Sequence, residues 1–190
     1  MKHRSNRLRI IAGRWRGRPL VFSNAEGLRP TGDRIRETLF NWLQAYVPGA
    51  RCLDLFAGSG ALGLEALSRG AESVVFVERA RPAADAIRAN LAKFDASGGQ
   101  VLQADALRFL QGPAERFDIV FIDPPFGSDI IGSCCELLER CGWLAPGALI
   151  YIEQDRSRPA PQLQDNWALH RQAHAGQVAY YLARRQQETS

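Results

Sequence analysis

The strongest constraint on the fold is a regular alternation of strand-like and helix-like segments through the middle of the chain. Apolar segments rich in β-branched residues occur at Cys52–Phe56, Ser73–Val77, Gln100–Gln103, Asp118–Ile122 and Leu149–Glu153. Helical patterns fill the gaps at Ala61–Arg69, Pro82–Phe94, Ala106–Leu110 and Ile130–Cys141. This alternation predicts an α/β fold built from βαβ units, with a mostly parallel twisted sheet and helices on both faces.

The two ends of the chain depart from this alternation. Trp167–His174 and Gln177–Ala183 are predicted to form an antiparallel hairpin at one edge of the sheet. Leu8–Phe22 predicts two short strands around a turn rich in glycine and arginine. Asp33 is predicted to cap a helix that runs to about Tyr46. We therefore expect an N-terminal extension, residues 1–48, packed on a body formed by residues 49–190.

Charge is distributed unevenly along the chain. Residues 1–36 hold ten Lys and Arg against two acids, a net charge of +8, whereas the other residues hold 14 basic and 18 acidic side chains. Arg14, Arg16 and Arg18 occupy alternate positions and would share one face of an extended segment. This asymmetry predicts a polyanionic partner that is bound from the N-terminal side.

The cysteine pattern argues against a metal site. Cys52, Cys134, Cys135 and Cys141 form no CxxC pair, and no His stands at ligand spacing from them, so we expect no metal. Adjacent cysteines are not typical of a disulfide framework, and this favours a reducing cytoplasm. Without an apolar run of about 20 residues or a signal-peptide core, we expect no association with a membrane.

The first strand leads into a glycine-rich loop, Leu53-Asp54-Leu55-Phe56-Ala57-Gly58-Ser59-Gly60. With Gly63 this loop satisfies the GxGxxG pattern, and Glu78 follows 20 residues after Gly58, where an acid would bind ribose hydroxyls. The pattern alone admits NAD, but Asp54 would add a negative charge beside a bound pyrophosphate. S-adenosylmethionine carries two positive groups instead, so an acid there favours this cofactor. Asp105 could reach its adenine amino group while the Ala106 backbone reads the ring edge.

The fourth strand ends in the most specific chemical signal, Asp123-Pro124-Pro125-Phe126. The two prolines fix the backbone and leave carbonyl groups free beside a carboxylate and an aromatic ring. The Asp123 carboxylate and the Pro124 carbonyl could accept both N–H bonds of an exocyclic amine, which would point its lone pair at a donor methyl group. Phe126 could stack on the base, which must be unpaired or flipped out to reach such a pocket.

Together these motifs resemble the class I Rossmann-like methyltransferases that modify base amino groups. Ile11-Ala12-Gly13, Arg16-Gly17-Arg18 and the stretch Arg29–Leu43 further resemble the bacterial RsmD family, and the resemblance covers nearly the whole chain. Gly32 stands where the family often has a second Thr. The family methylates N2 of a guanine in 16S ribosomal RNA, at position 966 in standard rRNA numbering.

The resemblance also implies the roles of individual residues. The cofactor S-adenosylmethionine would be held by Asp54, Phe56, Gly58, Gly60, Glu78, Asp105 and Ala106. The target guanine would be held by Asp123, Pro124, Pro125 and Phe126. RNA would be bound by Arg14, Arg16, Arg18, Arg34 and Arg36. The expected partner is ribosomal RNA within a 30S subunit or an assembly intermediate, and the expected state is a cytoplasmic monomer.

Three alternatives remain open from the sequence. A DNA adenine-N6 methyltransferase would use nearly the same pocket, although this chain has little room for a separate DNA-reading module. An NAD-dependent oxidoreductase is disfavoured by Asp54 and by the Asp123–Phe126 loop. A non-catalytic RNA-binding assembly factor on the same fold need not retain all four strand-end acids, Asp54, Glu78, Asp105 and Asp123.

Overall fold

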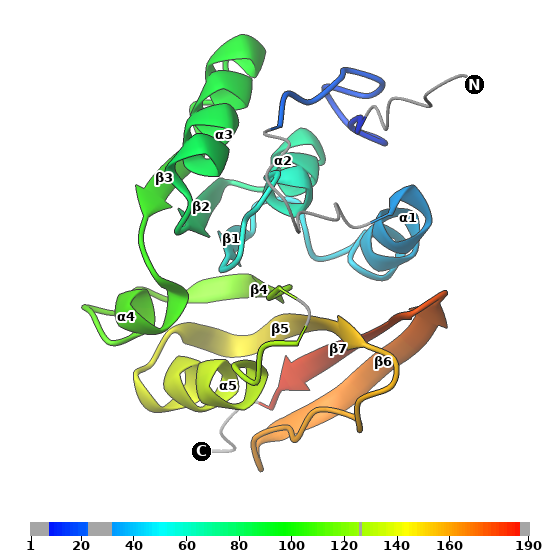
Figure 1. Cartoon of the computed structure of the whole chain (residues 1–190), viewed down its shortest axis with the longest axis vertical. Coiled ribbons are helices and arrows are strands. Elements are labelled where there is room, and N and C mark those ends of the chain that lie inside the picture. Colours follow the sequence, from blue (N-terminus) through cyan, green and yellow to red (C-terminus); the bar gives the residue numbers. More distant parts are fainter. Residues whose placement is uncertain (1–7, 23–31, 126, 187–190) are drawn as a thin grey trace.

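The computed structural model describes residues 8–22, 32–125 and 127–186, and these form one sheet of seven strands with five helices (Figure 1). The strands are β1 Arg51–Asp54, β2 Ser73–Glu78, β3 Gly99–Gln103, β4 Phe117–Ile122, β5 Leu144–Asp155, β6 Trp167–Ala175 and β7 Val178–Arg185. The helices are α1 Asp33–Trp42, α2 Ala61–Ser68, α3 Arg81–Phe94, α4 Ala106–Leu110 and α5 Ile131–Arg140.

The sheet has the strand order β3-β2-β1-β4-β5-β7-β6. The first five strands pair with one another in parallel, through β3–β2, β2–β1, β1–β4 and β4–β5. β7 runs antiparallel to both of its neighbours, β5 and β6. The mostly parallel sheet and the C-terminal hairpin predicted from the sequence are therefore confirmed. β1 and β4 lie side by side at the centre, where the chain order reverses direction, and ligands bind such sheets at this point.

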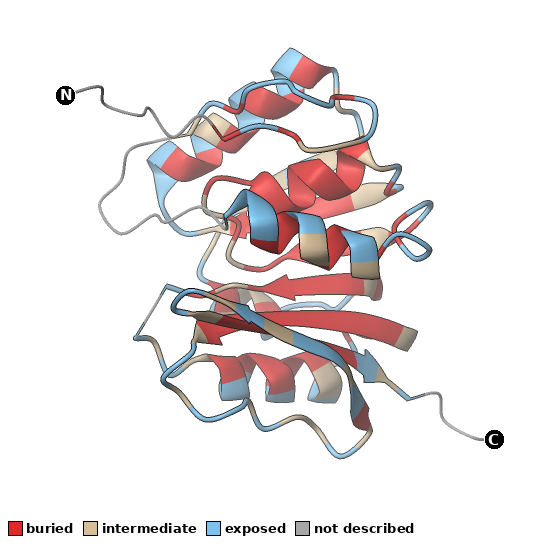
Figure 2. Cartoon of the chain, turned by 90° about the vertical axis from the view of Figure 1, so that its right-hand side faces the viewer, coloured by how far each residue is buried: buried red, intermediate tan, exposed pale blue. Residues whose placement is uncertain are grey.

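Each central strand is buried on both faces, which explains why it reads as a continuous apolar run. On β4 and β5, Phe121 and Tyr151 contribute to one apolar cluster, whereas Val120 and Ile150 contribute to the other. The first cluster holds α1, α2, α3 and residues 8–22, and the second holds α4 and α5. Figure 2 shows the buried residues concentrated in the sheet and on the helix surfaces that face it.

The N-terminal segment departs from the predicted hairpin. Residues 8–22 contain one isolated antiparallel bridge, Arg9 with Pro19, and no regular strand. Gly13 and Gly17 adopt positive φ angles of 83° and 78° and turn the chain between them. The segment docks through four buried side chains, Leu8, Ile10, Trp15 and Leu20. We call residues 8–22 the arm.

Two element boundaries also differ from the sequence-based expectation. Asp33 is the first residue of α1 rather than its cap, because Gly32 occupies the cap position without a side-chain hydrogen bond. The helix ends at Trp42, four residues earlier than predicted. β5 is longer than predicted at both ends and runs on to Asp155. Within the described ranges, no helix is long and apolar enough to cross a membrane.

Candidate active site

The loop between β1 and α2 is shaped by glycines in conformations that other residues rarely adopt. Gly58 has φ +52° and Gly60 has φ +75°, and the Gly60 amide donates to the Ala57 carbonyl over 2.6 Å. A Cβ atom on Gly60 would lie 2.9 Å from a side-chain carbon of Ile87. The absence of a side chain at Gly60 therefore lets Ile87 of α3 pack against the loop, and the positive φ angles make the tight turn that precedes α2.

Asp54 lies beneath this loop at the end of β1. Its side chain is 2% exposed, and its Oδ2 accepts a hydrogen bond from the Gly63 amide over 3.0 Å. Burial raises the pKa of Asp54 to about 7, an effect opposed by the Gly63 hydrogen bond and increased by the nearby Glu78. A buried acid of this kind gains from a cation placed nearby, because the cation stabilises the charged form.

Glu78 joins the end of β2 to the same loop. Its two carboxylate oxygens accept from the Gly58 amide at 2.8 Å and from the Ala80 amide at 2.7 Å. The 20-residue spacing between Gly58 and Glu78 is thus realised as a direct contact. The carboxylate is half-buried and retains lone pairs that could accept from ribose hydroxyls.

Asp105 begins α4 just beyond the end of β3. Its exposed side chain caps the helix, because Oδ1 accepts from the Arg108 amide over 3.1 Å. The second oxygen is not used in this cap, and Ala106 follows as a buried first residue of α4. The arrangement is compatible with the predicted adenine contact, although the cap gives Asp105 a structural role in its own right.

Asp123 and Pro124 follow directly after β4. Asp123 is half-buried, Pro124 is buried and Pro125 is exposed, whereas Phe126 lies outside the described residues. The register pairs Asp54 with Phe121, which places Asp123 two residues beyond the partner of Asp54. The acids that end β1 and β2 and those that follow β3 and β4 therefore lie along the carboxyl edge of four adjacent parallel strands, as the sequence predicted.

Two further polar residues lie on β5, the strand that pairs with β4, and were not predicted. Tyr151 is fully buried and donates from its hydroxyl to Oε2 of Glu153 over 2.7 Å, and Glu153 is only 4% exposed. The pKa of Tyr151 is raised by burial, then by the charges of Glu153 and Asp123. A period-two pattern of polar residues in the apolar run Tyr151–Glu153 was the available signal.

The predicted RNA-binding arginines divide into exposed and buried ones. Arg14, Arg16 and Arg34 are exposed. Arg18 is exposed too, but its guanidinium lies 4.6 Å from the Phe94 ring centre and donates to the Lys93 carbonyl. Because residues 12–17 form turns rather than a strand, the expected common face of alternating arginines is not present.

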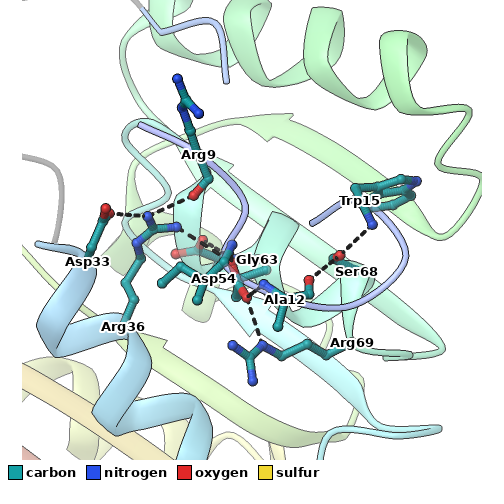
Figure 3. A network of polar contacts seen from close by, with 11 residues as sticks. Arg9, Ala12, Trp15, Asp33, Arg36, Asp54, Gly63, Ser68 and Arg69 are labelled. Carbon is teal, nitrogen blue, oxygen red and sulfur yellow. Dashed lines mark hydrogen bonds and ion pairs between the residues drawn. The ribbon is translucent and has the colours of Figure 1, made fainter. Parts of the chain in front are cut away.

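Arg36 is a correction to the sequence-based prediction, because its side chain is fully buried. Its guanidinium donates to Asp33 at 2.6 Å and to the Arg9 carbonyl at 2.8 Å (Figure 3). Nη1 lies 3.6 Å from the buried carboxylate of Glu65. Arg36 therefore holds the arm against α1 and α2 and is not accessible to RNA in this conformation.

Comparison with known proteins assigns the chain to a family. A family model described as conserved hypothetical protein 95 matches residues 8–184. Ribosomal RNA small subunit methyltransferase D of Escherichia coli strain K12 is 48% identical over 182 residues, which cover 96% of this chain and 92% of that protein. The chain belongs to the RsmD family.

Solved structures agree with membership of the RsmD family. The structure of yhhF from Escherichia coli superimposes with a TM-score of 0.89 and 46% identity, covering 95% of this chain and 98% of that one. The Thermus thermophilus 16S rRNA N2 G1207 methyltransferase RsmC, solved in complex with AdoMet and guanosine, has a TM-score of 0.64 at 24% identity. It covers 86% of this chain and 45% of its own, and it shows that the fold is shared.

No metal centre accompanies the site of this RsmD-family chain in residues 8–22, 32–125 and 127–186. Those residues contain no group of three His, Cys, Asp or Glu side chains placed to hold an ion. The four cysteines are free thiols, and all but the half-buried Cys141 are buried.

Proposed function

We propose that the chain transfers a methyl group from S-adenosylmethionine to the exocyclic N2 of a guanine in 16S ribosomal RNA. The observation that carries this proposal is the placement of Asp123-Pro124-Pro125 at the end of β4, directly beside the glycine-rich loop after β1. Methylation of small-subunit ribosomal RNA follows from the family, and the choice of guanine N2 rests on this site and on the resemblance.

S-adenosylmethionine is the methyl donor, and the residues present fit it. The glycine loop presents backbone rather than side chains at Gly58 and Gly60, and Glu78 offers a carboxylate for ribose hydroxyls. The raised pKa of Asp54 favours a cationic neighbour over a phosphate. When bound, the cofactor supplies an electrophilic methyl group attached to a positively charged sulfur.

Asp123 and Pro124 supply the groups that an exocyclic amine requires. The amine nitrogen is a poor nucleophile because its lone pair is delocalised into the base. The Asp123 carboxylate and the Pro124 carbonyl would accept its two N–H bonds and orient the lone pair. Positioning of this kind can contribute about 7–11 kcal/mol to catalysis. Transfer of the methyl group would leave a positive charge on the nitrogen, which makes its protons acidic. Asp123 would stabilise this charge until a proton is lost to water.

The RNA would approach from the side of the arm. Arg14, Arg16 and Arg34 carry exposed guanidinium groups, which bind phosphates through directed hydrogen bonds. The preferred substrate in this proposal is a 30S subunit or an assembly intermediate, where the target base is unpaired. Phe126, outside the described residues, would stack on that base.

The test is to incubate the protein with labelled S-adenosylmethionine and small-subunit particles that lack the modification. Mass spectrometry of the digested RNA should show N2-methylguanosine. The D123A variant should lose about 10²–10⁴-fold in turnover while it still binds S-adenosylhomocysteine in calorimetry. The exposed Asp165 provides a matched control, D165A, which should behave as the wild type. N6-methyladenosine as the product, or normal turnover of D123A, would contradict the proposal.

A further inference from the structure

Residues 127–130, which lie between the Asp-Pro-Pro motif and the start of α5 at Ile131, have no regular secondary structure. It is closed on itself by Ser128, whose amide and hydroxyl donate to the Pro125 carbonyl at 3.2 Å and 2.8 Å. Gly127 within this turn has φ +87°, and a Cβ atom added there would meet no described atom within 4 Å apart from its chain neighbours. These contacts close the turn but do not attach it to the sheet.

Arg158 provides that attachment from the turn that follows the carboxyl end of β5. Its Nη1 donates to the Ser128 carbonyl over 3.0 Å, and its Nη2 donates to the Gly127 carbonyl over 3.3 Å. Nη1 also lies 3.5 Å from the Asp129 carboxylate, whose side chain is fully exposed. One planar guanidinium thus holds two consecutive carbonyl groups, and a guanidinium suits this better than a point-like ammonium group.

The position of Arg158 is itself fixed by a short turn. Asp155 ends β5, and its Oδ1 accepts from the amide and the hydroxyl of Ser157 at 2.8 Å and 2.7 Å. These hydrogen bonds lower the pKa of Asp155, so the carboxylate form that makes them is the stable one. The Arg158 amide then donates to the Asp155 carbonyl over 3.1 Å. Because the turn is attached to β5, Arg158 connects the loop after β4 to the neighbouring strand.

We propose that Arg158 is a positioning residue for methyl transfer, which holds residues 127–129 so that the adjacent base-binding residues keep a reactive geometry. This inference rests on the proposed function of the Asp123–Phe126 loop. Arg158 would not contact the base or the cofactor. It acts through the carbonyl groups of Gly127 and Ser128, one and two residues beyond Phe126. A small displacement of reacting groups can cost about 10²-fold in rate, so loss of this attachment should be visible in turnover.

Arg156 provides a matched control in the same turn. It is exposed, and its backbone amide donates to the Gln177 carbonyl, a contact that substitution of the side chain leaves intact. R158A and R156A remove the same charge from positions two residues apart. A difference between them therefore reports the contacts of Arg158 rather than a general loss of positive charge near the RNA.

The experiment compares wild type, R158A, R158K and R156A on small-subunit particles, with single-turnover rates measured at saturating substrate. R158A should lower the rate about 10- to 100-fold and leave the KM for RNA and the affinity for S-adenosylhomocysteine within about twofold. R158K should recover only part of the rate, and R156A should match the wild type. An unchanged rate in R158A would overturn the proposal. So would a raised KM with a weaker salt dependence, which would make Arg158 a phosphate contact.

Hydrogen exchange separates this inference from the proposed function. The Ser128 amide, which donates to the Pro125 carbonyl within the turn, should exchange at least tenfold faster in R158A than in R156A, whatever the substrate. If wild type transfers no methyl group to the particles, the proposed function fails, although faster exchange would still support the attachment. Equal exchange in the two variants would show that Arg158 does not hold the loop, even if the wild type is fully active.

Discussion

A substitution of Gly13 tests how the arm is attached to α2. A Cβ atom at this position would lie 2.0 Å from the backbone oxygen of Ser68, and the residue already has φ +83°. Gly17 has a similar φ of +78°, but nothing lies within 4 Å of a Cβ atom there. G13A and G17A therefore share the cost of a left-handed conformation, about 1–2 kcal/mol, and only G13A adds a collision with backbone.

The size of the additional cost follows from the contacts that the collision would break. The Arg14 amide donates to the Ser68 carbonyl over 2.7 Å, the Trp15 amide donates to the Ser68 hydroxyl, and that hydroxyl donates to the Ala12 carbonyl. Each such hydrogen bond contributes about 0.5–1.5 kcal/mol, so losing all three costs roughly 1.5–4.5 kcal/mol. G17A carries no such additional cost, because a Cβ atom on Gly17 would meet nothing within 4 Å. We therefore expect the arm of G13A to detach while the sheet stays folded.

Limited trypsin digestion measures the detached population, because the backbone at Arg14 and Arg16 is held against α2 in the docked arm and can extend into the protease only when the arm leaves the body. An extra cost of about 3 kcal/mol should raise the cleavage rate of G13A roughly 100-fold over that of G17A. Binding of S-adenosylhomocysteine, measured by calorimetry, should remain in both variants. Equal cleavage rates for G13A and G17A would refute the reasoning, because the Ser68 contacts would then contribute nothing to docking.

Three further predictions follow from the ionisable groups. The pKa of Asp54 is about 7, so its carboxylate form, which attracts the ammonium group of S-adenosylhomocysteine, increases as the pH rises toward 7. The affinity for S-adenosylhomocysteine should therefore increase with pH up to about pH 7, by up to about tenfold per pH unit, and D54N should remove this dependence. Burial raises the pKa of Glu139, but hydrogen bonds from Arg185, Trp167 and Asn166 outweigh it and bring the pKa to about 2. E139A should therefore lower the free energy of unfolding by roughly 1–3 kcal/mol at pH 7, and urea titrations should show the difference shrinking as pH falls from 4.5 to 2. Burial raises the pKa values of Cys134 and Cys135 to about 12, so a thiol reagent should modify Cys141 first and the other three only on unfolding.

The sheet and its line of acids could be predicted from the sequence because they depend on local patterns. Strands buried on both faces read as apolar runs, and an acid directly after such a run must lie at the carboxyl edge of a parallel sheet. Asp54, Glu78 and Asp123 were all placed in this way. Their hydrogen bonds could not be predicted, because the Gly63 and Gly58 amides that bind them depend on the shape of the loop.

The arm could not be predicted because its shape depends on distant partners. Glu65 and Ser68 bind its backbone from more than 50 residues away, and no periodic pattern in the arm reveals them. Arg36 was assigned to RNA because the resemblance places the basic residues of this region against RNA, although it lies on the buried stripe of α1 with Leu39 and Phe40. A charged residue on an apolar stripe was the signal that it needed a buried partner.

The buried charge of Glu65 gives the arm a defined position rather than a general attraction to the body. Its carboxylate is fully buried and accepts from the Ile11 and Ala12 amides at 2.8 Å and 3.0 Å and from Arg69 at 2.7 Å. A buried carboxylate is stable only with such donors, so removing the arm would leave it underpaired. Apolar side chains alone would allow the arm to slide, whereas two backbone N–H groups fix its register. Glu65 lies on α2, and α2 begins at the loop that Asp54 supports. The exposed arginines of the arm are therefore held at a set distance from the proposed cofactor site.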